Sequence, residues 1–267
     1  MIRFTAPKGN IDKLAENSYR AIDDGAYEYE GAARSHTPLS LRKAILSSKH
    51  AALITEVKYS SPSQGKITSG SSTPSQIATE MVQGGACSLS VLTQPYLFEG
   101  SIRNLSEVRK TVSVPIIMKD IVVSRVQIDT AKRLGADCIL LIKSIFDRDL
   151  AEESFESFAQ YAGKFGLQVL AEAHTGIEYS DLLRQGQSIV GINNRNLDDL
   201  TIDPQNFKRL VELYGKGKSI VIAESGISQI SDIVQLHECG ADAFLVGTSI
   251  MASGDIKAKV AELRNAI

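Results

Sequence analysis

The sequence predicts an α/β protein in which eight strands alternate with helices, preceded by a helical segment. Three observations lead to this prediction: eight short apolar runs, a longer amphipathic segment between many of them, and a Gly-Ala-Asp or Gly-Ala-Cys tripeptide before three of them. Strands that are apolar along most of their length are typical of parallel sheets covered on both faces. Eight strand–helix units favour a (β/α)8 barrel, the TIM barrel, over a doubly wound sheet, whose G-x-G-x-x-G turn is missing from the sequence.

The apolar runs give the expected strands in chain order. Each run is about as long as a strand and turns polar only in its last few positions. We expect strands at 51–58, 87–93, 114–120, 137–143, 168–174, 189–195, 219–225 and 243–249. The amphipathic segments predict helices, several of which end at a glycine that follows the last apolar position. These helices are expected at 74–85, 124–135, 149–166 and 228–240.

Residues 1–48 form an extension before the first strand. Residues 11–31 of this extension have a helical pattern with one polar side. Two interpretations remain open: a helix that plugs the floor of the barrel, and a lid or wall of the active site. Because no Gly/Ser-rich linker or charge block interrupts the chain, we expect residues 1–267 to form a single domain whose barrel core spans 51–251.

The composition excludes several classes of protein. The chain has 29 Lys+Arg against 31 Asp+Glu, a formal charge of −2, so no basic field is available to hold a nucleic acid. The sequence has neither a signal-peptide core nor an apolar run near the roughly 18 residues of a membrane span, which predicts a cytoplasmic protein without a membrane partner. Cys87, Cys138 and Cys239 are widely spaced, which predicts buried free thiols. No histidine is spaced as a metal ligand, and we expect neither a metal nor an organic cofactor.

Polar side chains appear at the same end of five expected strands. Residues two apart in a strand share a face, and the carboxyl ends of the strands of such a barrel line its active site. The resulting mouth would be lined by Glu56, Lys58, Lys119, Glu172, Asn193, Arg195 and Glu224. The alternative interpretation is a ring of salt bridges that only closes the top of the barrel. Buried ionic groups are costly unless they are paired or used, which favours a functional site.

Loops rich in Ser and Gly follow the first, seventh and eighth expected strands. Their backbone N–H groups and hydroxyls suit an anion, and barrels of this kind commonly hold a phosphate after strands seven and eight. The residues expected to do so are Ser225, Gly226, Gly247 and Thr248, with Ser61 on the other side. A phosphorylated small molecule is therefore the favoured substrate.

Several segments then resemble one enzyme family. They are ITEVKYSSPSQG, SVLTQPYLFEGS, VPIIMKD, LAEAHT, VGINNRNLDDL, IAESGIS and AFLVGTSIM, in this order between about residues 50 and 251. The sequence resembles indole-3-glycerol phosphate synthases, which close the indole ring in tryptophan biosynthesis. The resemblance implies a (β/α)8 barrel with an extra N-terminal helical segment and no metal or cofactor. It also implies conversion of 1-(2-carboxyphenylamino)-1-deoxyribulose 5-phosphate into indole-3-glycerol phosphate, carbon dioxide and water.

The resemblance also implies roles for the residues of the mouth. Lys119 matches the general acid that protonates the ketone oxygen of the substrate. Glu172 matches the carboxylate credited with the later proton abstraction or with stabilising the cationic intermediate. Glu56 and Lys58 match a second acid–base pair, and which residue acts in the dehydration stays open. The remaining matches are Asn193 and Arg195 for binding and orientation, Glu224 as a further carboxylate, Ser61, Ser225, Gly226, Gly247 and Thr248 for the phosphate, and Phe98 and Leu141 as walls of the anthranilate ring.

This sequence departs from the family pattern at three positions. Ser60 stands where many relatives carry Lys or Arg, Gln94 replaces an acidic residue, and Thr248 replaces the more usual Ser. None of these changes removes a proton carrier. We therefore expect them to bear on affinity more than on chemistry.

Two other functions compete with the family's reaction. One is an aldolase-like lyase with Lys119 as a Schiff-base nucleophile, which requires a neutral amine. We expect Glu56 and Glu172 to lie near Lys119 and keep it charged, which argues against this chemistry. The other is a non-catalytic barrel that binds phosphate. A further expected interaction is an association with other enzymes of the tryptophan pathway.

Overall fold

The computed structural model describes residues 9–29, 31, 36–61, 65–66 and 72–267. Within this part of the chain, eight parallel strands close into a barrel in the order β1-β4-β5-β6-β7-β8-β9-β10 and back to β1. The barrel strands are β1 (Leu53–Val57), β4 (Ser88–Leu92), β5 (Ile116–Lys119), β6 (Cys138–Ile142), β7 (Gln168–Ala173), β8 (Ile189–Asn193), β9 (Ile220–Glu224) and β10 (Ala243–Val246). Each lies inside an expected run, so the predicted (β/α)8 barrel is confirmed.

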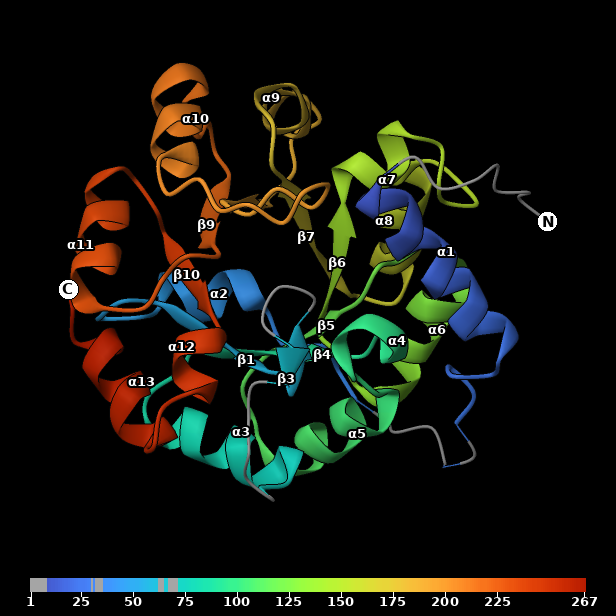
Figure 1. The fold of residues 1–267 in the computed structure, drawn as a ribbon, viewed down its shortest axis with the longest axis horizontal. Helices are drawn as coiled ribbons and strands as arrows, with labels where there is room; N and C mark the ends of the chain where they lie inside the picture. Colours follow the sequence, from blue (N-terminus) through green and yellow to red (C-terminus); the bar gives the residue numbers. More distant parts are fainter. Residues whose placement is uncertain (1–8, 30, 32–35, 62–64, 67–71) are drawn as a thin grey trace.

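Helices surround the barrel, as Figure 1 shows. The helices that follow barrel strands are α3 (Pro74–Gln83), α4 (Pro95–Phe98), α5 (Ile102–Thr111), α6 (Arg125–Leu134), α7 (Lys143–Asp147), α8 (Phe155–Lys164), α9 (Gly176–Arg184), α10 (Asn206–Tyr214), α11 (Ile230–Glu238), α12 (Thr248–Met251) and α13 (Ile256–Arg264). A short antiparallel pair, β2 (Ser60–Ser61) and β3 (Gly65–Lys66), follows β1. No described helix has the length and apolar character needed to cross a membrane.

Several helices begin where the sequence supplies a capping group. Capping boxes start α3, α6 and α9, at Thr73, Ser124 and Thr175. Helix α8 is shorter than the expected helix 149–166. It begins only at Phe155, because the Ser154 hydroxyl caps it and Asp149 has a left-handed backbone with a φ of 53°.

The N-terminal extension contributes to both ends of the barrel. Helix α1 (Asn10–Asp23) packs against α4 and α7, which follow the carboxyl ends of strands, so it lies at the mouth. Helix α2 (Leu41–Leu46) packs against β4 at the opposite end, where the Arg42 N–H donates to the side chain of Gln168, the first residue of β7, at 3.3 Å. The helical segment singled out in the sequence therefore forms a wall of the mouth. A second helix occupies the floor.

A buried carboxylate anchors the extension at the floor. Asp137 is fully buried just before β6. Its oxygens contact His36 Nε2 at 2.6 Å, the Leu39 N–H at 2.6 Å, Arg109 at 2.9 Å and the Ile116 N–H at 2.7 Å. Because His36 and Leu39 belong to the extension while Ile116 begins β5, this cluster joins the extension to the amino ends of the strands.

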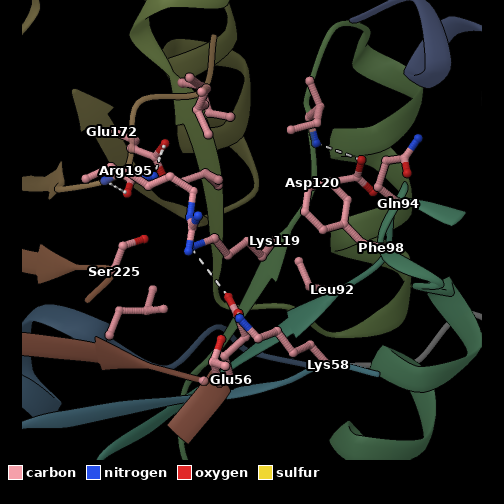
Figure 2. Close-up of a pocket in the computed structure, with 18 of the residues that line it drawn as sticks. Glu56, Lys58, Leu92, Gln94, Phe98, Lys119, Asp120, Glu172, Arg195 and Ser225 are labelled. Carbon is pink, nitrogen blue, oxygen red and sulfur yellow. Dashed lines mark hydrogen bonds and ion pairs between the residues drawn. The ribbon is translucent and has the colours of Figure 1, made fainter. Parts of the chain in front are cut away.

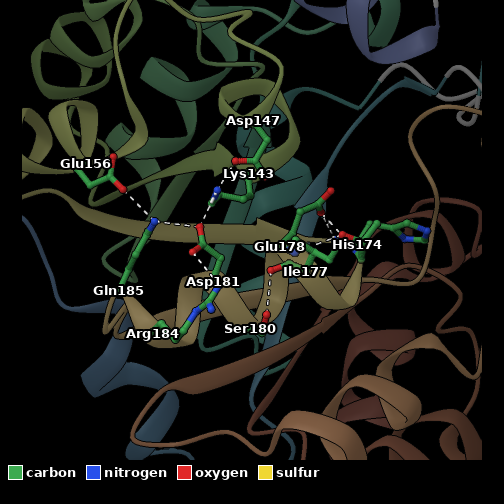
Figure 3. A network of polar contacts seen from close by, with 11 residues as sticks. Lys143, Asp147, Glu156, His174, Ile177, Glu178, Ser180, Asp181, Arg184 and Gln185 are labelled. Carbon is green, nitrogen blue, oxygen red and sulfur yellow. Dashed lines mark hydrogen bonds and ion pairs between the residues drawn. The ribbon is translucent and has the colours of Figure 1, made fainter.

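A second ionic cluster lies outside the barrel, between β6, α7 and α9 (Figure 3). Lys143 directly follows β6, its side chain is buried, and it forms ion pairs with Asp147 and with Asp181, the latter at 2.8 Å. Asp181 also accepts hydrogen bonds from Arg184 and Gln185. We call Lys143, Asp147 and Asp181 the outer cluster.

The three cysteines are free thiols, as expected. Cys138 is fully buried in β6, whereas Cys87 and Cys239 are only partly buried. The prediction that the thiols are buried is therefore fully confirmed for Cys138 only.

Candidate active site

The carboxyl ends of the barrel strands surround a cavity, shown in Figure 2. Side chains that are distant in sequence meet there, because neighbouring parallel strands place their ends side by side. Most of the residues predicted for the site line this cavity: Glu56, Lys58, Phe98, Lys119, Glu172, Asn193, Arg195, Ser225, Gly226, Gly247 and Thr248. Glu224 contacts Lys119 at the edge of this group. The side chain of Ser61 lies outside the described part of the chain.

Leu141 is not part of the cavity wall, so the prediction for it is wrong. The residues of β6 that line the cavity are Leu140 and Ile142. Leu141 lies between them, and alternate residues of a strand face opposite sides. Because β6 reads Cys-Ile-Leu-Leu-Ile, no polar residue marks which side of the strand faces inward.

Lys119 is the centre of the ionic contacts in the cavity. It ends β5, and its Nζ lies 2.9 Å from Glu224 Oε2 and 3.5 Å from Glu56 Oε2. Glu56 also pairs with Lys58 at 3.0 Å. The expected carboxylate neighbours were Glu56 and Glu172. The structure confirms Glu56 but places Glu224, rather than Glu172, in hydrogen-bond contact with the ammonium group.

These contacts shift the pKa values of Lys119 and Glu56 in opposite directions. Burial by itself lowers the pKa of Lys119, but the carboxylates of Glu224, Glu56 and Glu172 raise it well above its usual range. Burial by itself raises the pKa of Glu56, but the ammonium groups of Lys58 and Lys119 lower it to about 2. Both members of the Lys119–Glu56 pair are therefore charged at neutral pH.

Glu172 behaves differently from the other two glutamates. Burial and the neighbouring carboxylate of Glu224 raise its pKa to about 8, against the lowering effects of Lys119 and a 3.1 Å hydrogen bond from Asn193 Nδ2. Its carboxyl group is therefore protonated in a large fraction of molecules at neutral pH. A group with this pKa can both give and take a proton near physiological pH.

Two glycines make room for the carboxylates. Gly191, inside β8, lies in register with Glu172 of the neighbouring strand, and a Cβ atom at 191 would lie 2.1 Å from Glu224 Oε1. A Cβ atom at Gly247 would lie 2.8 Å from Glu56 Oε1. This steric role was not predicted for either residue. Gly191 carried an available signal, because a glycine within a strand often marks a close approach of another group, whereas Gly247 lies just after β10.

The predicted phosphate side of the cavity has an unusual backbone. Ser225 and Gly226 both adopt left-handed conformations, with φ values of 67° and 81°. The buried side chain of Asn194 holds this turn, because its amide donates to the Ser225 carbonyl at 3.2 Å. Gly247 and Thr248 follow β10 next to the turn, and Thr248 begins α12. The loops after β9 and β10 thus place Ser225, Gly226, Gly247 and Thr248 on one side of the cavity.

The opposite wall is mainly apolar. Phe98 and Leu92 lie there in Figure 2, and Leu14 of α1 completes it.

Arg195 extends from the end of β8, and its guanidinium group donates to the Leu200 carbonyl at 2.8 Å. A ligand in this cavity would contact a charged side, the side predicted to hold a phosphate and an apolar side.

His174 lies outside this cavity. It lines a second cavity that shares Ile142, Glu172 and Leu197 with the first, and its Nδ1 lies 2.8 Å from the Asn193 carbonyl. Among the described residues, no group of three or more His, Cys, Asp and Glu side chains is arranged to hold a metal ion.

Comparison with known proteins identifies the family to which this chain belongs. The family model for indole-3-glycerol phosphate synthase matches residues 13–263. The indole-3-glycerol phosphate synthase of Methanocaldococcus jannaschii is 41% identical over 230 residues, covering 84% of this chain and 82% of the relative. That of Campylobacter concisus is 35% identical over 259 residues, covering 95% of this chain and 97% of the relative. The chain belongs to the indole-3-glycerol phosphate synthase family.

Family membership identifies the chain as an enzyme of tryptophan biosynthesis, a carboxy-lyase that acts on a phosphorylated small molecule. A further member, from Oceanobacillus iheyensis, is 39% identical over 212 residues and covers 79% of each chain. The solved structure of thiamine phosphate pyrophosphorylase from Pyrococcus furiosus has a TM-score of 0.59 at 17% identity, over 83% of this chain and 96% of that one. This last likeness shows the barrel fold alone.

The three departures from the family pattern lie at or near the cavity. Ser60 is buried in β2, directly after the loop residue Tyr59. Gln94 lines the cavity, and its side-chain oxygen accepts the Leu97 N–H at 3.0 Å at the start of α4. Thr248 lines the cavity beside the turn at Ser225 and Gly226. None of the three contacts the ionic group around Lys119 among the described interactions.

Proposed function

We propose that this chain converts 1-(2-carboxyphenylamino)-1-deoxyribulose 5-phosphate into indole-3-glycerol phosphate, carbon dioxide and water, with Lys119 as the general acid. The observation that carries the proposal is the contact of the Lys119 ammonium with Glu224 at 2.9 Å and Glu56 at 3.5 Å on the wall of the cavity. This arrangement keeps the lysine charged and therefore able to deliver a proton.

In the first step, the ring carbon that carries the carboxylate attacks the ketone carbon of the substrate. A carbon–carbon bond forms, the carbonyl π electrons move to the oxygen, and Lys119 supplies the proton that makes it a hydroxyl group. The ring is left with a positive charge. Carbon dioxide then leaves, and its bonding electrons restore the aromatic ring.

In the second step, the new hydroxyl group leaves as water. An acid must protonate the leaving oxygen, and a base must remove a proton from the pyrroline ring so that the indole double bond forms. Glu172 is suited to the base role, since its pKa of about 8 lies close to physiological pH. We assign the supporting acid–base pair to Glu56 and Lys58, which lie 3.0 Å apart.

The remaining residues of the cavity suit binding. Three carboxylates and three cations meet at the mouth, namely Glu56, Glu172 and Glu224 with Lys58, Lys119 and Arg195. The formal charges of these six groups cancel, and protonation of Glu172 leaves them with an excess of positive charge toward an anionic substrate. We assign the phosphate to the turn at Ser225 and Gly226 with Gly247 and Thr248, the orientation of the reacting groups to Asn193 and Arg195, and the aromatic ring to the wall that contains Phe98.

The Schiff-base lyase is the second candidate for this lysine. Its nucleophile must be a neutral amine. Because Glu224, Glu56 and Glu172 raise the pKa of Lys119, the neutral form is disfavoured in the free protein. A barrel that only binds phosphate is disfavoured by the ionic group itself, since buried charges are costly where they have no use.

The test is an assay of the purified chain with the synthetic substrate, followed by the absorbance or fluorescence of the indole product. We expect turnover in the parent and a loss of about 10²–10⁴-fold in Lys119→Ala, which is the usual contribution of general acid–base catalysis. Borohydride added with substrate should leave Lys119 unlabelled. No indole product from a folded parent would overturn the proposed function, and covalent labelling of Lys119 would favour the lyase.

Four expectations stay predictions from the sequence. They are the cytoplasmic location, an association with other enzymes of tryptophan biosynthesis, the absence of a cofactor and the single-domain organisation of residues 1–267. Gel filtration of a mixture of the chain with the other enzymes of the pathway tests the association.

A further inference from the structure

A buried carboxylate lies directly after the lysine that we assign as the general acid. Asp120 is 2% exposed at the edge of the cavity, beside Phe98 in Figure 2. Its two oxygens accept hydrogen bonds from the Tyr27 hydroxyl at 2.9 Å, the Thr93 hydroxyl, Gln127 Nε2 at 3.1 Å and the Ile121 N–H at 2.8 Å. All four partners are donors, which is the environment that an ionised carboxylate requires.

These donors come from different parts of the fold. Tyr27 belongs to the N-terminal extension, just after α1, Thr93 follows β4, and Gln127 lies in the first turn of α6. The backbone carbonyl of Tyr27 in turn accepts hydrogen bonds from Thr130 and Arg133 of α6, at 3.2 and 2.9 Å. Asp120 therefore joins the extension, two strand ends and a helix at one buried point.

Thr93 connects this point to the backbone of Lys119. Its N–H donates to the Lys119 carbonyl at 3.1 Å, while its hydroxyl donates to the Asp120 carboxylate. Thr93 thus contacts both the carbonyl of the peptide group between Lys119 and Asp120 and the carboxylate of Asp120. Since β5 ends at Lys119, no further strand pairing fixes the chain beyond this residue. The direction of the long lysine side chain depends on that peptide group.

We propose that Asp120 is a positioning residue, which fixes the backbone at the end of β5 so that the Lys119 ammonium stays in contact with Glu224 and Glu56. The inference rests on the proposed function for its effect on turnover, but not for its effect on geometry. Reacting groups must be placed to within a fraction of an ångström, and a 1 Å displacement can cost about 10²-fold in rate.

Asp137 at the barrel floor provides a matched control. It is also a fully buried carboxylate, it also accepts several donors, and it also joins the N-terminal extension to the strands. It differs in lying at the amino ends of the strands, away from Lys119. A purely structural role would give both carboxylates similar effects.

The experiment compares kcat and KM of the parent, Asp120→Asn and Asp137→Asn, at a temperature at which circular dichroism shows all three folded. We expect kcat of Asp120→Asn to fall about 10- to 100-fold with KM within about threefold, because the amide places donors against donors and releases the peptide group. Asp137→Asn should keep kcat within about twofold of the parent, because distant sites act independently. Equal kcat losses in both variants, or no loss in Asp120→Asn, would overturn the inference.

Milder variants keep the test available if either asparagine variant does not fold. Tyr27→Phe removes one donor from Asp120 and should lower kcat about threefold, in line with the loss of one hydrogen bond to a charged group. Ser88→Ala removes a 2.8 Å hydrogen bond between Ser88 and the Pro115 carbonyl at the amino end of β4 and should leave kcat unchanged. Similar kcat values in these two variants would contradict the inference.

A crystal structure of Asp120→Asn, or of Tyr27→Phe in its place, gives a readout that needs no activity. The expected result is loss of the 2.9 Å contact between Lys119 Nζ and Glu224 Oε2. An unchanged contact overturns the inference whatever the assay shows. An inactive parent, in contrast, overturns only the proposed function.

Discussion

Two lysines at the ends of adjacent strands have different surroundings. Lys119 ends β5 and turns into the barrel, where it contacts Glu224 and Glu56. Lys143 follows β6 and turns outward to Asp147 and Asp181. Each lysine is largely buried and has two carboxylate partners, so composition alone does not distinguish the two groups.

The carboxylates differ in how completely their hydrogen bonds are satisfied. The side chains of Glu56 and Glu224 are 6% and 1% exposed, and within the described structure Glu56 Oε2 has only the 3.5 Å contact with Lys119 Nζ, while Glu224 Oε1 has no N–H or hydroxyl donor. Asp147 and Asp181 are 39% and 31% exposed, and water can therefore reach them. Asp181 has further donors in Arg184 and Gln185.

This difference indicates which of the two groups is built for chemistry. A buried carboxylate oxygen without a donor costs stability, and such a cost is typical of a functional site. The outer cluster has no such cost, because its oxygens have donors or solvent. Unused hydrogen-bonding capacity in a cavity, rather than the presence of charges, separates the candidate active site from a structural ion pair.

The largest contrast is expected between equivalent substitutions of the two lysines. Lys119→Met should lower kcat about 10²–10⁴-fold, because it removes the proposed proton donor. Relative to the parent, it should also lower the free energy of unfolding by more at neutral pH than at pH 4, since Glu56 loses one of the two ammonium groups that lower its pKa. Turnover of the synthetic substrate and urea unfolding at both pH values measure these effects. Turnover within a few-fold of the parent would place Lys119 with Lys143 as a structural lysine.

The second-largest effect is expected in the pH dependence of stability and turnover that Glu172 causes. Its pKa of about 8 lies above the usual value of about 4.3, so the folded protein favours the protonated form. This contribution to stability is fully present below about pH 4 and is lost as the pH rises through about 8. As a base the group must be ionised, so kcat/KM of the parent should rise with pH up to about 8.

Glu172→Gln should lose this rise and lower kcat about 10²-fold. Its free energy of unfolding should increase relative to the parent as the pH is raised from 4 to 8. Rate profiles and unfolding curves over this range test both expectations. A variant that keeps the parent's pH profile would show that another group titrates.

Gly191→Ala tests the space that the ionic group around Lys119 requires. The added methyl would lie 2.1 Å from Glu224 Oε1 and should displace this carboxylate from Lys119. We expect kcat to fall about 10-fold, a loss of the size that misplaced catalytic groups give. Gly163→Ala, in the exposed face of α8 with no atom within 4 Å of the new methyl, is the control. It should leave kcat unchanged and stabilise the helix by about 0.5–1 kcal/mol.

The smallest effect is expected in the outer cluster. Lys143→Met should leave kcat within about twofold of the parent, because the residue faces away from the cavity. The loss of stability should be about 1 kcal/mol, since Asp147 and Asp181 can be hydrated once the lysine is gone. Thermal unfolding and the indole assay measure both. A large loss of turnover here would remove the distinction between the two groups.

The strands of the barrel could be predicted from the sequence with good accuracy, and so could the residues at their ends. Glu56, Lys119 and Glu172 were found because each is a charged residue that interrupts an apolar run. Leu141 was assigned wrongly, because β6 has no polar residue to reveal which side faces inward. Asp120 was not assigned a role, because its partners Tyr27 and Gln127 are distant in sequence and are brought to it only by packing.

The sequence by itself determined the strand–helix alternation, the set of charged side chains at the mouth and the family. Alternation and strand-end position are properties of a few consecutive residues, so a linear pattern can carry them. Only the tertiary structure decided that Lys119 pairs with Glu224 rather than with Glu172, and that α1 lies at the mouth while α2 lies at the floor. These outcomes depend on the register between strands and on the room that Gly191 leaves, which exist only once the barrel has closed.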